Sequence, residues 1–171
     1  MYKRQVPAFV EEFLFRGVLF GVLRKYGDGF AILISSLLFG LMHGNIIQIP
    51  FAFIGGLALA FLVMYTGSII PAMLLHFANN FYSVIGDIVT TQFGTLIGNI
   101  FYILVMGTTL LLALLGLFFL SRKDKGLFHI EKPDSSLTLK ERLKTFFVTP
   151  GVIIAVVLLV GEAAMTWMMV S

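Results

Sequence analysis

The sequence predicts an all-α, polytopic membrane protein. Of its 171 residues, 58% are hydrophobic and only 12% are charged, and the mean hydropathy is +0.98. A soluble domain of this size needs much more polar surface. Several apolar stretches also approach the length of about 20 residues that a helix needs to cross a bilayer. These observations together predict a bundle of transmembrane helices.

About six hydrophobic segments are long enough to cross or nearly cross a bilayer. In chain order they are Val6–Leu23, Phe30–Met42, Pro50–Tyr65, Ile69–Ile85, Leu96–Leu120 and Thr149–Val170. The second and third are short for a full span. We expect residues 1–120 to form a transmembrane core, residues 121–147 a basic polar loop, and residues 148–171 a C-terminal transmembrane helix.

The polar loop contains a short amphipathic segment, "TLKERLKTFF". Thr138 and Glu141 have the spacing of a capping box, which predicts the start of a helix. The apolar residues that follow on one face are Leu139, Leu143, Phe146 and Phe147. We interpret this segment as an interfacial helix, with an ordinary connector as the alternative. The loop is also basic, with Arg122, Lys123, Lys125, Lys132, Lys140, Arg142 and Lys144.

The charge balance and the cysteine count exclude several classes of function. The net charge of +3 is weak and scattered, so a nucleic-acid partner is not expected. The chain has no cysteine, which excludes disulfides, thiolate metal sites and a cysteine nucleophile. No cleavable signal is expected, because Met1–Gln5 is polar and the apolar stretch after it carries charges.

Three short motifs place ionisable residues on hydrophobic segments. The first segment carries Glu11, Glu12 and Arg16, so Glu12 and Arg16 share a helix face and can form an ion pair. Glu11 has a phenylalanine, and not an arginine, at the fourth position after it. Its carboxylate is therefore not expected to form such an ion pair within the helix and can act in proton transfer. A charge in hydrocarbon costs a few kcal/mol, and ionisable residues inside a membrane usually mark a functional site. The pair could also be a structural brace.

The second and third motifs each contain a histidine. Phe39 and His43 are four residues apart at the end of the second segment, and His76 and Asn80 are four apart in the fourth. Residues at this spacing lie on one helix face. A single membrane histidine is more often a hydrogen-bonding residue between helices. The three motifs together favour a catalytic or proton-handling site. Glu162 stands alone in the last segment, and the sequence gives it no role.

The set Glu-Glu-x-x-x-Arg, Phe-x-x-x-His and His-x-x-x-Asn, in this order, resembles the CPBP intramembrane proteases. These are the CaaX prenyl endopeptidases and the bacterial Abi-type proteins. The resemblance covers roughly residues 6–83. Family members usually have further hydrophobic segments before the first motif, so we expect a short member or a part of a longer protein.

The resemblance implies roles for individual residues. Glu11 and His43 would activate a water molecule, and His76 and Asn80 would stabilise the oxyanion of the tetrahedral intermediate. Glu12, Arg16 and Phe39 would support the site. An amide donor such as that of Asn80 suits an oxyanion hole.

Cofactor use has two interpretations. His43, His76 and Glu11 would form a plausible zinc set. The metalloprotease signature His-Glu-x-x-His is absent, and asparagine is a poor zinc ligand. We therefore expect a metal-free mechanism, with zinc as the alternative.

Two other classes of function remain as alternatives. A proton-coupled transporter also clusters Glu, His and Arg at mid-membrane, but it predicts internal repeats, and the chain has no convincing repeat. A non-catalytic bacteriocin-immunity-type protein would keep the fold without using the site. We expect an integral protein of the bacterial plasma membrane that acts on a peptide or a membrane protein. A leader peptide is a better expected substrate than a prenylated one.

Overall fold

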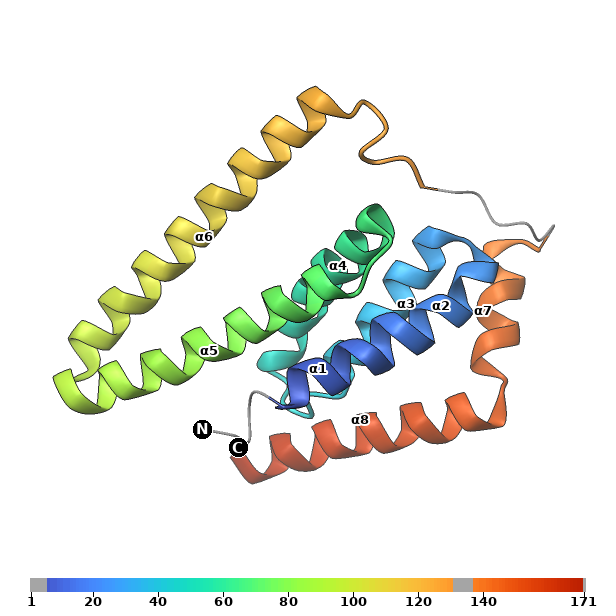
Figure 1. Cartoon of the computed structure of the whole chain (residues 1–171). Helices are drawn as coiled ribbons and strands as arrows, with labels where there is room; N and C mark the ends of the chain where they lie inside the picture. Colours follow the sequence, from blue (N-terminus) through green and yellow to red (C-terminus); the bar gives the residue numbers. More distant parts are fainter. Residues whose placement is uncertain (1–5, 131–136, 171) are drawn as a thin grey trace. The chain divides into compact units, whose positions relative to one another are not determined.

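The structure is a computed structural model that describes residues 6–130 and 137–170, all of them in helices or connecting turns (Figure 1). The predictions about Met1–Gln5 and Lys132 lie outside the described residues. In chain order the elements are α1 (Val6–Glu12), the π-helical η2 (Phe13–Leu19), α2 (Phe20–Leu23), the 3₁₀ turn η3 (Arg24–Tyr26), α3 (Asp28–Leu41), α4 (Gln48–Thr66), α5 (Ile70–Phe93), α6 (Thr95–Lys123), α7 (Leu139–Phe147) and α8 (Pro150–Val170). The predicted all-α class is confirmed.

Three helices are long and apolar enough to cross a membrane. They are α4, α6 and, in α8, the stretch Pro150–Met169, and they match three of the predicted segments. The helix α3 is apolar but shorter. The remaining two predicted segments lie in the helix that runs from α1 to α2 and in α5, both of which carry ionisable or amide residues. An integral membrane protein is therefore indicated, while a full set of six spans is not shown.

The chain divides into two compact units. The hairpin unit contains Met1–Val10 and Met73–His129, and the core unit contains Glu11–Ala72 and Ile130–Ser171. The boundaries fall inside α1 and α5. Each unit is therefore described separately below.

The core unit is built on the packing of α3 against α4. Buried side chains of both helices, among them Ile34, Leu38 and Leu59, form one apolar cluster with residues of α2. The two helices approach closely at Gly40, where a Cβ would lie 3.0 Å from the carbonyl oxygen of Ile49. A side chain at this position would push the helices apart, because interiors are packed as densely as organic crystals.

The predicted helix in the polar loop is confirmed as α7, and so is its capping box. The Thr138 backbone N–H donates to Glu141 Oε2 at 2.7 Å, and the Glu141 N–H donates back to Thr138 Oγ1 at 3.4 Å. These hydrogen bonds, first from the backbone and then from the hydroxyl of Thr138, lower the pKa of Glu141. The ionised carboxylate is therefore the form that caps the helix.

The apolar face of α7 packs on the core unit. The ring of Phe146 lies edge-on to that of Phe30, with 6.1 Å between centroids, and Leu143 and Phe147 join the same cluster. Leu139, at the start of the helix, is 58% exposed. Arg142 also ties α7 to the core unit, because its Nη1 donates to the carbonyl oxygen of Tyr26 at 2.9 Å. Most of the predicted apolar face thus has a protein partner.

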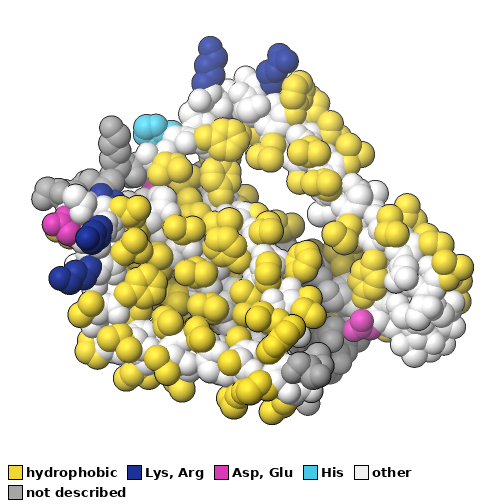
Figure 2. Space-filling model, turned by 180° about the vertical axis from the view of Figure 1, so that it is seen from behind, with side chains coloured by type: hydrophobic (Ala, Val, Ile, Leu, Met, Phe, Trp, Pro, Cys, Tyr) yellow, Lys and Arg dark blue, Asp and Glu magenta, His cyan; other side chains and the backbone are white. Residues whose placement is uncertain are grey.

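The hairpin unit consists mainly of α5 and α6, which turn at Gly94 (Figure 1). Gly94 has a φ of 87°, a conformation that favours glycine. The Tyr102 hydroxyl of α6 donates to the Ser83 carbonyl of α5 at 3.4 Å. The most apolar window of α6 contains no buried residue. Figure 2 shows hydrophobic side chains over much of the visible surface. Such a surface suits contact with lipid.

Candidate active site

The first motif lies on a helix that changes its hydrogen-bond pattern at the motif. The turn Phe13–Leu19 is π-helical, and the N–H of Phe20 donates to the carbonyl oxygen of Phe15, five residues earlier. Single π-helical turns inside α-helices are frequent at functional sites. This turn contains Arg16, and it follows directly after Glu11 and Glu12.

Glu12 and Arg16 form the ion pair that their spacing predicts. The Arg16 Nη1 atom donates to Glu12 Oε1 at 3.0 Å, and both side chains are fully buried. The Nη2 atom of Arg16 donates to the carbonyl oxygen of Gly56 in α4 at 3.1 Å. The guanidinium therefore joins the first motif to α4, and the pair acts as a buried brace.

Phe39 connects this brace to the histidine of the second motif. The Arg16 guanidinium carbon lies 4.2 Å from the centroid of the Phe39 ring. On α3, the ring of Phe39 packs edge-on against the imidazole of His43, with 4.9 Å between centroids. Cation–π contacts of this kind are worth about 2 kcal/mol when they are desolvated. The contacts Glu12–Arg16–Phe39–His43 thus form a continuous series, which we call the brace series.

The hydrogen bond of His43 defines which ring nitrogen can accept a proton. Its Nδ1 lies 2.9 Å from the carbonyl oxygen of Phe39. A carbonyl oxygen can only accept, so Nδ1 must carry the hydrogen. In the neutral imidazole the lone pair is then on Nε2. The half-buried His43 side chain therefore presents a basic nitrogen away from its own helix.

Glu11 lies in the core unit with the brace series, and its side chain is half-buried. Its neighbour Glu12 is fully buried with Arg16. The two adjacent glutamates therefore have different surroundings, as the sequence indicates. A half-buried carboxylate keeps access to water, whereas Glu12 is enclosed.

His76 and Asn80 lie one helical turn apart on α5 in the hairpin unit. His76 is only 6% exposed, and Asn80 is half-buried. Phe77 and Phe81, which follow them on α5, stack at 6.2 Å between centroids. Glu11 and His43 belong to the core unit, so the convergence of all four predicted catalytic residues stays a prediction.

Two features of the site have no signal in the sequence. The Gly56 carbonyl receives a hydrogen bond from Arg16 across 40 positions of the chain. Glu162 of α8 lies against Gly44, directly after His43, although the sequence gives it no role. Neither contact follows from helical periodicity, because both depend on how distant helices pack.

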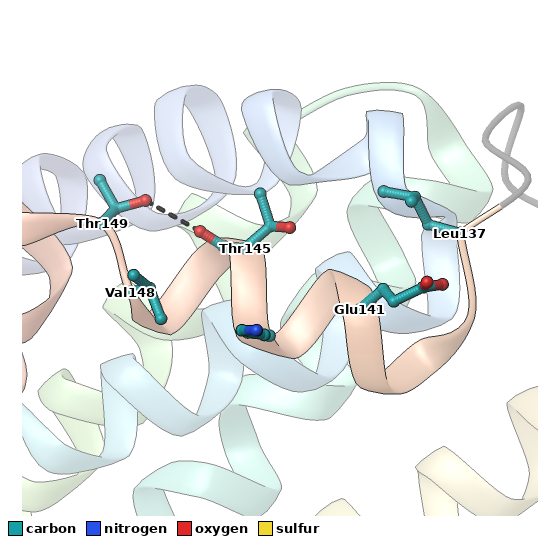
Figure 3. Close-up of a pocket in the computed structure, with 6 residues that line it drawn as sticks. Leu137, Glu141, Thr145, Val148 and Thr149 are labelled. Carbon is teal, nitrogen blue, oxygen red and sulfur yellow. Dashed lines mark hydrogen bonds between the residues drawn. The ribbon is translucent and has the colours of Figure 1, made fainter.

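A surface pocket lies on α7, and no residue of the three motifs lines it (Figure 3). It is lined by Leu137, Glu141, Lys144, Thr145, Val148 and Thr149. The dashed line in Figure 3 marks the hydrogen bond from Thr149 Oγ1 to the carbonyl oxygen of Thr145, 3.1 Å long. None of the predicted catalytic residues lines this pocket. Within each unit, the described residues include no cluster of three His, Asp or Glu placed to hold a metal ion.

Comparison with protein families gives a match to part of the chain. Residues 5–82 match the family described as type II CAAX prenyl endopeptidase Rce1-like. The similarity to the Rce1-like CAAX endopeptidase family is thus limited to residues 5–82, a stretch that includes all three motifs. The family indicates a protease with a peptide substrate. Comparison with curated proteins gives no match, and comparison with solved structures gives none either.

The contact of Arg16 with Gly56 leads to a first prediction. A Cβ on Gly56 would lie 3.1 Å from the Cβ of Ser36 and 3.2 Å from Arg16 Nη2. Gly56→Ala should therefore displace the guanidinium and destabilise the protein by about 1–3 kcal/mol, as overpacking does. The unfolding free energy in a membrane mimetic measures this.

Gly55→Ala is the matched control, because nothing lies within 4 Å of a Cβ at that position. It should leave stability unchanged or raise it by up to about 1 kcal/mol, since glycine weakens a helix interior relative to alanine. Equal stability of the two variants would show that the Arg16–Gly56 contact does not constrain the site.

Proposed function

We propose that the protein is an intramembrane endopeptidase in which Glu11 and His43 activate a water molecule for attack on a peptide carbonyl. The observation that carries this proposal is the hydrogen bond from His43 Nδ1 to the Phe39 carbonyl. It assigns the lone pair to Nε2, which can then accept a hydrogen bond from the attacking water. The brace series supports the proposal, because the Phe39 ring packs against the imidazole and is itself in contact with the Arg16 guanidinium.

In this proposal Glu11 is the carboxylate partner of His43. A half-buried glutamate next to an enclosed ion pair can exchange a proton with water while the brace stays intact. Glu11 takes the proton of the attacking water and passes it to the amine nitrogen as the C–N bond of the peptide breaks. His43 orients the water through Nε2. General bases of this kind contribute about 10²–10⁴ to the rate.

His76 and Asn80 are the proposed donors to the oxyanion. The Asn80 amide carries two N–H groups, and a histidine carries at least one. Their spacing on α5 gives them a common helix face, and His76 is held in a buried position. A fixed donor in a water-poor site stabilises the charge that develops on the carbonyl oxygen.

The substrate of the proposed reaction is a peptide or a membrane protein that reaches the site within the bilayer. The three long apolar helices support a membrane location. We further propose that the helix from α1 to α2, α3 and α5 are also embedded, which gives the six hydrophobic segments that the sequence predicts. The proposed location is a bacterial plasma membrane, with a leader peptide as substrate.

Peptide cleavage by the purified protein tests this function and its metal dependence together. The protein is reconstituted in liposomes and incubated with a panel of leader-like peptides, and products are identified by mass spectrometry. We expect cleavage that persists after prolonged treatment with a chelator, with no stoichiometric zinc by elemental analysis. Activity that is lost on chelation and restored by zinc would instead assign Glu11, His43 and His76 to a metal site.

A further inference from the structure

Glu162 is the charged residue of an otherwise apolar helix. It lies in the stretch Pro150–Met169 of α8, which is long and apolar enough to cross a membrane and has no other Asp, Glu, Lys or Arg. A carboxylate within a membrane-spanning helix is costly, and such residues usually line an interior or a water-filled cavity. A functional role for this carboxylate would explain why it lies within an apolar helix.

The carboxylate lies on the turn that carries His43. A Cβ on Gly44 would be 3.1 Å from Cγ, Cδ and Oε1 of Glu162. Gly44 is buried and has a φ of 62°, so glycine suits this position both for its backbone and for its lack of a side chain. The close approach places Glu162 beside Gly44, the residue that directly follows His43.

The turn does not use this carboxylate as a cap. The N–H of His43 donates to the Gly40 carbonyl and the N–H of Gly44 to the Leu41 carbonyl, each at 3.1 Å. Both donors of the turn are therefore satisfied by backbone oxygens. Glu162 is exposed, and its carboxylate makes no hydrogen bond or ion pair with any residue in the part of the chain that the structure describes.

Apolar residues of α8, and not Glu162, hold this helix against the core unit. Ala163 is 7% exposed, and Val152, Val156 and Leu159 pack against the apolar cluster of the core unit. Apolar contacts thus hold the helix, which leaves the carboxylate available to a ligand. In a water-poor site, a carboxylate is best compensated by a cation that also hydrogen-bonds to it.

We propose that Glu162 is a specificity-determining residue that binds a lysine or arginine side chain of the substrate beside His43. This proposal rests on the endopeptidase function proposed above. A peptide is the substrate class that the family domain indicates, and lysine and arginine are its cationic side chains at neutral pH. The ion pair would fix the peptide so that a bond near the basic residue lies beside His43.

Matched peptides test the proposal. A cleaved peptide is made in two forms that differ at one residue near the cleaved bond, lysine in one and norleucine in the other. For the wild type we expect kcat/KM to favour lysine by about 10- to 100-fold, mainly through KM, as a close charge pair of about 1.4–2.8 kcal/mol gives. In Glu162→Gln the ratio should fall to near one. A ratio that is unchanged by Glu162→Gln, or a wild type without preference, would overturn the proposal.

A charge exchange separates recognition from a structural effect. Glu162→Lys should favour a glutamate peptide over the lysine peptide, an inversion that mere loss of packing would not produce. Asp124→Asn removes one carboxylate from the segment after α6 and should keep the wild-type preference for lysine. Loss of the preference in Asp124→Asn would mean that net charge, and not Glu162, selects the peptide.

A binding measurement separates this proposal from the proposed function. The Glu11→Gln variant should not hydrolyse the peptides, so their affinities can be measured directly by fluorescence anisotropy. We expect Glu11→Gln to bind the lysine peptide about 10- to 100-fold more tightly than the norleucine peptide, and the double variant with Glu162→Gln to lose this difference. Such binding without hydrolysis by the wild type would overturn the endopeptidase function and retain the recognition site. Equal binding of both peptides to Glu11→Gln would overturn the recognition site.

Discussion

Glu11→Gln should abolish peptide hydrolysis while the protein remains folded. The substitution keeps the size of the side chain and removes the group that accepts the proton of water, so the rate should fall by about 10²–10⁴. The fully buried ion pair of Glu12 with Arg16 keeps both of its partners in this variant. Initial rates on a verified peptide and the thermal unfolding midpoint measure the two effects separately.

The control for this prediction is Glu12→Gln, the same substitution at the neighbouring glutamate. Glu12→Gln should lower the stability, since Arg16 would then keep an uncompensated buried charge. Glu11→Gln should leave the unfolding midpoint near that of the wild type. If Glu11→Gln retained wild-type turnover, the base would have to be assigned to Glu12 instead.

Arg16→Met should be the most destabilising single change among those considered. It removes the partner of a fully buried carboxylate, and breaking one side of a buried pair costs about 3–5 kcal/mol. It also removes the contact with the Phe39 ring and the hydrogen bond to the Gly56 carbonyl. The unfolding free energy in a membrane mimetic should fall accordingly, and activity should fall with it because His43 loses its support.

Two further variants isolate the buried charge as the cause. Arg16→Met combined with Glu12→Gln should recover much of the stability, because an apolar or neutral replacement of both partners leaves no buried charge. Arg122 also lies over a phenylalanine ring, that of Phe118, with 5.0 Å to the centroid, but it is exposed. Arg122→Met should therefore cost about 1 kcal/mol or less. Equal losses in Arg16→Met and Arg122→Met would contradict the role of the buried pair.

The features that were predictable from the sequence are local. The pairing of Glu12 with Arg16 and the capping box of Thr138 with Glu141 follow from spacings of four and three residues, which one helix fixes by itself. The apolar runs also predict α4, α6 and α8 to within a few residues. Hydropathy is less informative for α5, which continues to Phe93 although the predicted segment ends at Ile85. Polar residues in that stretch weaken the hydrophobic signal without ending the helix.

The features that were not predictable depend on packing between distant parts of the chain. The Gly56 carbonyl accepts from Arg16 because α4 lies within reach of η2 in the folded chain, and a backbone oxygen cannot be recognised in a sequence motif. The same holds for Glu162, which reaches Gly44 from a helix more than a hundred residues further along the chain. The apolar face of α7 packs largely on protein, because periodicity indicates that a face is apolar and not what covers it.

Hydrolysis in ¹⁸O-labelled water tests the central claim most directly. The wild type and Glu11→Gln, both in liposomes, are given the same cleavable peptide in labelled water, and the new carboxyl terminus is analysed by mass spectrometry. Water activated by Glu11 predicts ¹⁸O in the new carboxylate with the wild type and almost no product with Glu11→Gln. Equal amounts of labelled product from both proteins would contradict the claim that Glu11 activates the attacking water.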